Sequence, residues 1–222
     1  MADRDGRFGP DARMKPEEIE RRSMEIISGE LETMGFTAPE IYMPVIRRVI
    51  HTTADFDYAK TLYFSENVMD AAAGAFRPGT VIVTDTNMAK AGISARTAGK
   101  LGMELRCFMA DPEVAEEAGR REMTRAAVSM ERAAALGRPV VIVCGNAPTA
   151  LFSLVRLHEE TGFSPLLTVG VPVGFVNVVR SKELLIESGL PCIVNRGRKG
   201  GSGVAAAVMN ALLYMLEPGR GR

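Results

Sequence analysis

Short apolar runs alternate with amphipathic segments along most of this chain. Five short runs are β-rich and mostly apolar: TVIVTD (80–85), MELRCFM (103–109), PVVIVCG (139–145), LLTVG (166–170) and PCIVN (191–195). Strands that are apolar on both sides are covered on both faces, as in parallel sheets flanked by helices. Helix-like segments separate the five runs, so the pattern predicts an α/β fold with a three-layer, doubly wound, mainly parallel sheet.

Two further helices are expected before this alternation begins. Pro16 followed by two glutamates is typical of a helix start, and Gly35 is typical of a helix end. A second helix is expected from Ile41 to about His51, because its apolar residues recur at helical spacing. The polar residues 1–14 are predicted to be a loose arm. We therefore expect one domain over residues 1–222, with an N-terminal helical segment.

Composition excludes several classes of protein. The 222 residues contain 27 Lys+Arg and 27 Asp+Glu, and this zero formal charge argues against a nucleic-acid surface, which needs a basic excess. The three cysteines are scattered and odd in number, which indicates reduced thiols in a cytoplasmic protein. The polar N-terminus predicts no secretory signal, and no apolar run is long enough to predict a membrane span.

Ligands of doubly wound sheets bind beyond the carboxyl ends of the strands, so the turns that leave the strands are the places to search. The turn NRGRKGGSG combines Arg196, Arg198 and Lys199 with four glycines, and a helix is expected to begin at or just after Ser202. This turn is either an anion site at a helix N-terminus or a flexible basic turn capped by Ser202. It does not match the phosphate-binding pattern GxxxxGK[ST].

Polar residues also follow two other predicted strands. Asp85 and Asn87 follow TVIVTD, where they either hold a ligand or cap a helix. Asn146 follows PVVIVCG, where it either contacts a ligand or serves the turn itself. The residue types alone leave both alternatives open.

The chain has two histidines, His51 and His158. His158 lies beside two glutamates near a predicted helix end, where a capping or solvated role is expected. His51 lies in RRVIHTTADFD, and no second histidine at ligand spacing or CxxC pair completes a metal site with it. If His51 is reactive, it acts as an acid or base, and the two threonines after it are expected to hold its ring through their hydroxyls.

Several motifs occur in an order that resembles the precorrin-8X methylmutase family, also called cobalt-precorrin-8 methylmutases. They are IERRSMEII, RRVIHTTADFD, VIVTDTNMAKAGI, MTRAA, GNAPTALF, GVPVGFVNVV and GRKGGSGVAAAVMNALL, and they span roughly residues 17 to 213. The resemblance implies a flavodoxin-like fold, a homodimer with sites near the subunit interface, a tetrapyrrole substrate and no cofactor. HTTADFD and GFVNVV are more similar to the cobalt-containing branch.

The resemblance also implies roles for particular residues. His51 is the proton donor to the substrate, and Ser23, Arg48 and Arg125 contact the substrate. The expected site therefore has one catalytic residue and no metal, and its substrate-binding residues are Ser23, Arg48, Asp85, Asn87, Arg125, Asn146, Arg196, Arg198 and Lys199. The chain departs from the family at Arg180, where a glutamate is usual, and a changed helix start or dimer surface is expected there.

The implied reaction moves a methyl group between adjacent carbons of ring C by a sigmatropic rearrangement. Protonation of a ring nitrogen makes the framework electron-poor and speeds the shift, and the carboxylates around the flat macrocycle suit arginine side chains. Two other functions remain open: a tetrapyrrole carrier without catalysis, and an α/β protein that binds anions or nucleotides through GRKGGSG.

Overall fold

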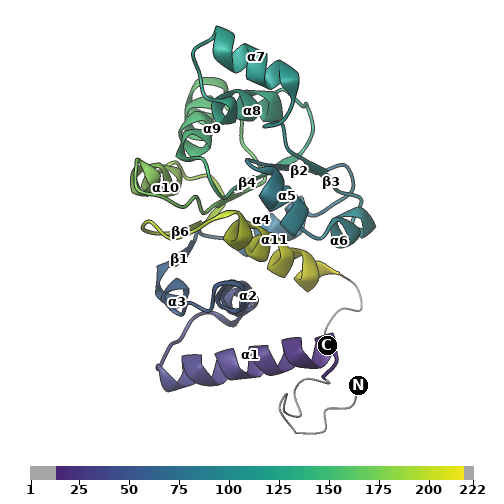
Figure 1. Ribbon diagram of the computed structural model, residues 1–222, viewed down its shortest axis with the longest axis vertical. Coiled ribbons are helices and arrows are strands. Elements are labelled where there is room, and N and C mark those ends of the chain that lie inside the picture. The colour runs from purple at the N-terminus through teal and green to yellow at the C-terminus, as the bar shows by residue number, and fades with distance from the viewer. Residues whose placement is uncertain (1–13, 218–222) are drawn as a thin grey trace, which may run out of the picture.

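The computed structural model describes residues 14–217, which surround a six-stranded sheet with the order β1-β6-β5-β4-β2-β3 (Figure 1). The strands are β1 (Leu62–Phe64), β2 (Val81–Thr84), β3 (Glu104–Arg106), β4 (Val140–Cys144), β5 (Leu167–Gly170) and β6 (Cys192–Asn195). Strands β2 to β6 are parallel, and their order, with the second strand outermost next to the first, is that of flavodoxin-like sheets. The predicted mainly parallel α/β sheet is confirmed.

The prediction of five strands was incomplete, because β1 adds a sixth. This strand pairs with β6 in antiparallel orientation, with Leu62 opposite Asn195. It has only three residues, all partly buried, and it follows directly on the short helix α3 (Asp57–Thr61). A three-residue edge strand leaves too short an apolar run for sequence periodicity to reveal it.

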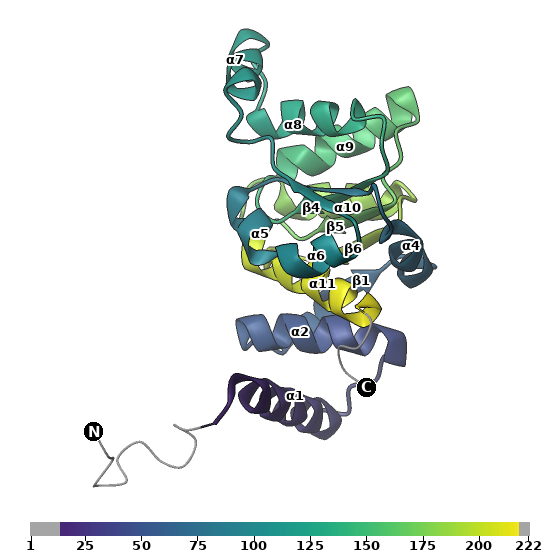
Figure 2. The ribbon, with the colours of Figure 1, turned by 90° about the vertical axis from the view of Figure 1, so that its right-hand side faces the viewer.

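Helices cover both faces of the sheet (Figure 2). One face is covered by α7 (Pro112–Arg120), α8 (Arg125–Ala134), α9 (Pro148–Thr161) and α10 (Val178–Glu187). The other face is covered by α4 (Val68–Ala75), α5 (Asn87–Gly92), α6 (Ala95–Lys100) and α11 (Ser202–Leu216). Helix α9 directly follows β4 and α11 directly follows β6, so both begin at the carboxyl edge of the sheet.

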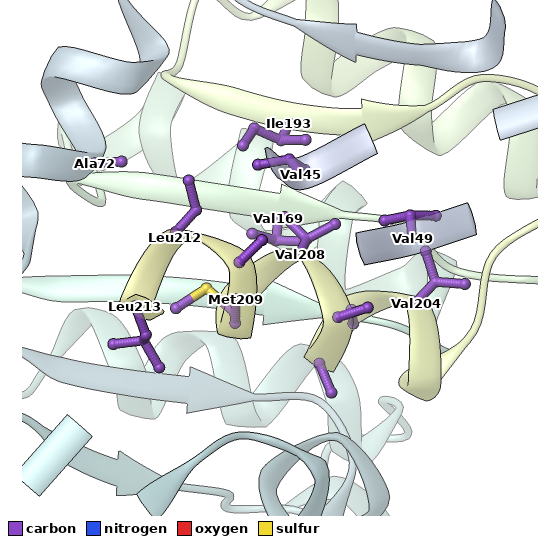
Figure 3. Close-up of a cluster of buried hydrophobic side chains, with 14 of the residues drawn as sticks. Val45, Val49, Ala72, Val169, Ile193, Val204, Val208, Met209, Leu212 and Leu213 are labelled. Atoms are coloured by element: carbon purple, nitrogen blue, oxygen red, sulfur yellow. The ribbon is translucent and has the colours of Figure 1, made fainter. Parts of the chain in front are cut away.

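Two N-terminal helices extend this second layer. Helix α11 lies on the sheet, α2 (Met43–Thr53) packs on α11, and α1 (Pro16–Thr33) packs on α2 (Figure 1). Along the chain, the short 3-10 turn η2 (Glu40–Tyr42) connects α1 to α2. Val204, Val208 and Leu212 of α11 are buried between the sheet and α2, whose Val45 and Val49 face them (Figure 3). A helix that is apolar all round must be covered on both sides, and α2 supplies the second cover.

The predicted helix boundaries hold to within a few residues. Helix α1 ends at Thr33, with Gly35 in the left-handed conformation at φ 64°. Helix α2 runs two residues beyond His51, so that His51 lies in its last turn. Apart from Met14, the predicted loose arm lies outside the described residues. Within residues 14–217 no helix is both long and apolar enough to cross a membrane.

Candidate active site

The buried carboxylate of Asp85 is hydrogen-bonded to the backbone of the turn between β4 and α9. Asp85 is 1% exposed, and its carboxylate accepts hydrogen bonds from the backbone N–H groups of Gly145 (2.9 Å), Asn146 (2.7 Å) and Ala147 (2.7 Å). Burial, and then the Asp85 carboxylate, raise the pKa of the neighbouring Cys144 thiol well above its usual range, so this thiol stays neutral. Three N–H donors stabilise the buried Asp85 charge, and the turn in return presents Asn146 at the surface.

Thr86, in the turn after β2, caps helix α5 and was not selected from the sequence. Thr86 Oγ1 accepts a hydrogen bond from Ala89 N at 3.0 Å, so Thr86 rather than Asp85 or Asn87 caps α5. Thr86 Oγ1 also lies 2.8 Å from Ser202 Oγ, which joins this turn to the start of α11. Asn87 is the exposed first residue of α5 at the same edge of the sheet.

The Gly-rich loop between β6 and α11 is hydrogen-bonded through its backbone to the loop after β5. Gly201 N donates to Val171 O at 2.9 Å, and Gly174 N donates to Arg198 O at 3.2 Å. A Cβ atom on Gly200 would lie 2.1 Å from Val171 O, and Gly200 has a φ of 156°. This close backbone approach explains why glycine stands at position 200.

Most cations of this loop already have carboxylate partners. Arg196 Nη1 binds Glu183 at 2.7 Å, and Lys199 Nζ lies 2.6 Å from Asp55 and 2.7 Å from Asp57. Arg198 differs, because within residues 14–217 it has no carboxylate partner. Its guanidinium lies 5.5 Å from the ring centroid of Phe175, which is 83% exposed. The loop therefore offers one uncompensated guanidinium beside an exposed aromatic ring.

Lys182 of α10 reaches this loop from the inside. Its side chain is fully buried, and Nζ donates to Gly197 O and to Lys199 O, both at 2.8 Å. Burial lowers the pKa of Lys182 to about 8. The sequence gives no signal for this residue, because a lysine in an amphipathic helix is usually on the solvated face.

His51 is exposed on the last turn of α2. Its imidazole makes no hydrogen bond or ion pair within the part of the chain that the structure describes, so its ring nitrogens are available to a ligand. The prediction that the adjacent threonines hold the ring was wrong. Thr52 Oγ1 donates to Arg48 O at 2.9 Å and Thr53 Oγ1 donates to Val49 O at 2.8 Å, as hydroxyls in helices commonly do.

Arg48 lies one turn before His51 and lines a pocket of about 320 Å³ between α1, α2 and α11. Its Nη2 atom is 2.6 Å from Glu20 of α1, and its guanidinium lies 5.3 Å from the ring centroid of Tyr214. Arg47 lines the same pocket but was not selected from the sequence. Its Nε atom is buried without a hydrogen-bond partner in the described range, and its ion pair with Glu40 is long, at 3.9 Å.

Ser23 and Arg125 lie apart from this pocket. Ser23 is on α1, one turn after Glu20, and its hydroxyl donates to Ile19 O at 2.9 Å. Arg125 is the exposed first residue of α8, on the other face of the sheet, and its guanidinium has no ion pair within residues 14–217. The structure therefore brings His51 and Arg48 together, and links the Arg198 loop to them through Lys199, but it does not join Arg125 to this group within one chain.

His158 has the capping position that was expected from the sequence. It lies in the last turn of α9, where Nδ1 is 3.1 Å from Phe163 O and 3.0 Å from Ser164 Oγ. Its ring is thus engaged with the residues that leave the helix, away from the exposed His51.

Comparison with known proteins gives a consistent result. The sequence profile of a family described as precorrin-8X methylmutase matches residues 18–215. A cobalt-precorrin-8 methylmutase of Salmonella typhimurium is 44% identical over 208 residues, covering 91% of this chain and 97% of that protein. One from Priestia megaterium is 38% identical, covering 93% of this chain and 91% of that protein. The crystal structure of a precorrin-8x methyl mutase from Thermus thermophilus matches with a TM-score of 0.81 at 34% identity, covering 91% of this chain and 99% of that one. On this profile match and these identities, the chain belongs to the precorrin-8X methylmutase family.

Proposed function

We propose that this protein is an isomerase that moves a methyl group between adjacent ring-C carbons of precorrin-8 or cobalt-precorrin-8, giving hydrogenobyrinate or cobyrinate. The observation that carries the proposal is that an exposed His51 and the pocket-lining Arg48 lie one turn apart on the same face of α2. An acid and a carboxylate-binding group are the two functions that this reaction needs from the protein. Membership of the family supports the choice of substrate.

In the proposed mechanism His51 donates its proton to a nitrogen of the macrocycle. The bond between the methyl group and one ring carbon breaks while a bond to the neighbouring carbon forms, so the product has the same atoms as the substrate. The proton then returns to His51. General acid catalysis of this kind contributes roughly 10²–10⁴-fold to a rate. The exposure of the imidazole and its lack of partners in the described chain suit this role.

We propose that arginines bind the carboxylates around the macrocycle. Arg48 and Arg47 lie in the pocket one turn from His51, and Arg198 has no carboxylate partner in residues 14–217. A guanidinium binds a carboxylate through two parallel hydrogen bonds, which fixes orientation as well as affinity. Arg48 is paired with Glu20 but lines the pocket, so we propose that a substrate carboxylate displaces Glu20 from it. Arg196 and Lys199 keep their partners outside the pocket lining and act mainly by long-range attraction for the same carboxylates.

The uncharged polar groups of the site complete the proposal. Ser23, Asn87 and Asn146 are at least partly exposed and are proposed to contact substrate oxygens. Asp85 is too deeply buried for this, and we propose instead that it acts by holding the turn that carries Asn146.

We further propose a homodimer with sites near the subunit interface. Arg125 lies on the other face of the sheet from His51, and a partner subunit offers one way to bring an Arg125 to each site. Exposed apolar side chains support an interface: Ile26 of α1 is 53% exposed, and Phe175 and Val176 in the loop after β5 are 83% and 77% exposed. Burial of such side chains in a dimer would be favourable.

Two finer points are also proposals. The motifs HTTADFD and GFVNVV favour the cobalt-containing substrate. A cytoplasmic location is supported by Cys107, Cys144 and Cys192, which are all buried and free.

The proposal is tested by mixing the purified protein with precorrin-8 or with cobalt-precorrin-8 and following the visible spectrum. Conversion to the product chromophore supports the isomerase. A spectral change that saturates at one ligand per site without product indicates a tetrapyrrole carrier. Absence of corrinoid binding together with binding of phosphate compounds indicates the anion- or nucleotide-binding alternative.

A further inference from the structure

Lys182 is the one buried Lys or Arg among residues 14–217. Its ammonium donates to the carbonyls of Gly197 and Lys199, which are two residues apart in the same loop. Asn195 Nδ2 donates to the same Lys199 carbonyl at 2.9 Å, and Asn195 Oδ1 accepts from Thr61 Oγ1 at 2.6 Å. The backbone at Lys199 is therefore held from two directions.

Burial of a charged ammonium group costs free energy, and neutral donors could hold a loop without that cost. Two neutral carbonyls replace water only in part, and burial lowers the pKa of Lys182 as a result. The Gly-rich loop is also held by Gly201 N on Val171 O and by Gly174 N on Arg198 O. Its general course thus has other supports, and the two Lys182 bonds fix specifically the carbonyls on either side of Arg198.

The side chain of Lys199 connects the Gly-rich loop to the residues that follow α2. Its Nζ atom binds Asp55 at 2.6 Å and Asp57 at 2.7 Å. Asp55 N donates to Thr53 Oγ1 at 3.3 Å, and Thr53 is the last residue of α2, which carries His51. Lys182 is thus connected through Lys199 to the helix end that bears the proposed acid.

We propose that Lys182 is a positioning residue that sets His51 against the substrate by fixing Lys199. This inference rests on the proposed function. The buried ammonium fixes the Lys199 backbone, and the Lys199 side chain fixes the residues that follow α2. The side chain of Lys182 is fully buried, so it acts on the geometry of the reaction rather than by contact with the substrate.

The test replaces the ammonium while keeping the length of the side chain, with the variant Lys182→Met. With cobalt-precorrin-8 or precorrin-8 as substrate, kcat is expected to fall at least about tenfold, while KM changes less than about threefold. Lys60→Met, at an exposed lysine of the neighbouring α3, is the matched control and keeps the wild-type kcat. An unchanged kcat in a folded Lys182→Met variant overturns the proposal.

A double-mutant cycle separates positioning from a general loss of structure. If Lys182 acts through Lys199, then Lys182→Met has little further effect on kcat in a Lys199→Met background. Independent, multiplicative losses contradict the proposed connection. Should Lys182→Met fail to fold, Lys199→Met alone still has to lower kcat, and a wild-type kcat in that variant overturns the inference.

Hydrogen exchange provides a readout that does not require turnover. In Lys182→Met the amides of residues 51–57 are expected to exchange faster than in the wild type, whereas those of the distant α8 are unchanged. Unchanged protection at residues 51–57 argues against the connection. If the wild-type protein converts neither substrate, the proposed function fails on its own, and this exchange measurement still decides whether Lys182 positions the end of α2.

Discussion

The Nζ atom of Lys199 lies 2.6 Å from Oδ2 of Asp55, which joins the Gly-rich loop after β6 to the residues that follow α2. The hydrogen bond from Lys199 lowers the pKa of Asp55, and the bonds to Asp55 and Asp57 raise the pKa of Lys199. The folded-state pKa of Asp55 lies below its ordinary value of 3.8, so its contribution to stability is present above that pH and is lost as the pH falls further. The contact therefore persists at neutral pH.

The first prediction concerns His51. His51→Ala is expected to keep the fold, because the side chain is exposed and makes no hydrogen bond or ion pair within residues 14–217. The variant should still bind the corrinoid but lose roughly 10²–10⁴-fold in turnover, the usual contribution of a general acid. Visible spectra of the variant with precorrin-8 measure both properties.

The other histidine provides the control for this experiment. His158→Ala removes contacts at the end of α9 and is expected to leave turnover unchanged. Conversion by His51→Ala at nearly the wild-type rate would mean that binding geometry alone drives the rearrangement.

The second prediction concerns carboxylate binding. Arg48→Gln and Arg125→Gln are each expected to weaken corrinoid binding by about 1.5–3 kcal/mol, the range for hydrogen bonds to charged groups. Arg47→Gln should weaken it as well, because the Arg47 Nε atom is buried in the described chain without a partner. Titrations at low and high salt measure the loss, which should shrink at high salt.

The control is Arg77→Gln, at an exposed position before β2. If affinity stays at the wild-type level in the Arg48 and Arg125 variants, these arginines do not bind the substrate.

The sequence predicted the parallel strands because burial on both faces leaves continuous apolar runs such as Val140–Cys144. It did not predict β1, because Leu62–Phe64 is too short for any periodicity. The fold class thus follows from local composition, whereas an edge strand depends on the partner that it meets.

The candidate site likewise contains residues that local sequence marks and residues that only long-range packing brings together. His51 and Arg48 were selected because motifs and a rare residue type mark them in the sequence. Lys182 was not, because its burial follows from packing against residues 15 and 17 positions further on. The pairing of Lys199 with Asp55 spans 144 positions, and no local pattern encodes it.

The third prediction concerns Gly200. Gly200→Ala is expected to destabilise the protein by about 1–3 kcal/mol or more, since a strained φ and a backbone clash act together. The added Cβ would lie 2.1 Å from Val171 O. Gly203→Ala is the matched control, because nothing lies within 4 Å of its Cβ position and its φ is ordinary. Urea denaturation of both variants measures the difference, and equal stabilities would contradict the close approach of the two loops.

The fourth prediction concerns assembly. Sedimentation at micromolar concentration is expected to give about twice the chain mass of 24.0 kDa. Ile26→Glu places a charge on an exposed apolar position of α1 and is expected to weaken the dimer if this face is the interface. Glu25→Gln, at the adjacent exposed residue, is the control. A fully active monomer would rule out a site shared between subunits.

The last prediction is a pH dependence of stability that isolates Lys182. The pKa of Lys182 is about 8 in the folded protein, below the ordinary value of 10.5, because burial disfavours the charged form. Between these two values the unfolded chain binds one more proton than the folded protein at this group. Lys182 therefore makes stability rise with pH in this window, and the full cost of its buried charge is present below pH 8.

Two cysteines act in the opposite direction, so a single pH curve of the wild type does not resolve Lys182. Burial raises the pKa of Cys192 to about 12 and raises that of Cys144, and both contributions to stability are lost as the pH rises above the ordinary value of 9.0. The measurement is therefore the difference in unfolding free energy between the wild type and Lys182→Met, from urea denaturation at several pH values. From pH 8 to 10.5 this difference should change in favour of the wild type by at most about 1.4 kcal/mol per pH unit, the value for one proton. Lys60→Met, at an exposed lysine, is the control variant measured over the same pH range. A Lys182→Met difference that does not change with pH in this range would show that the ammonium is not buried at a cost in the folded protein.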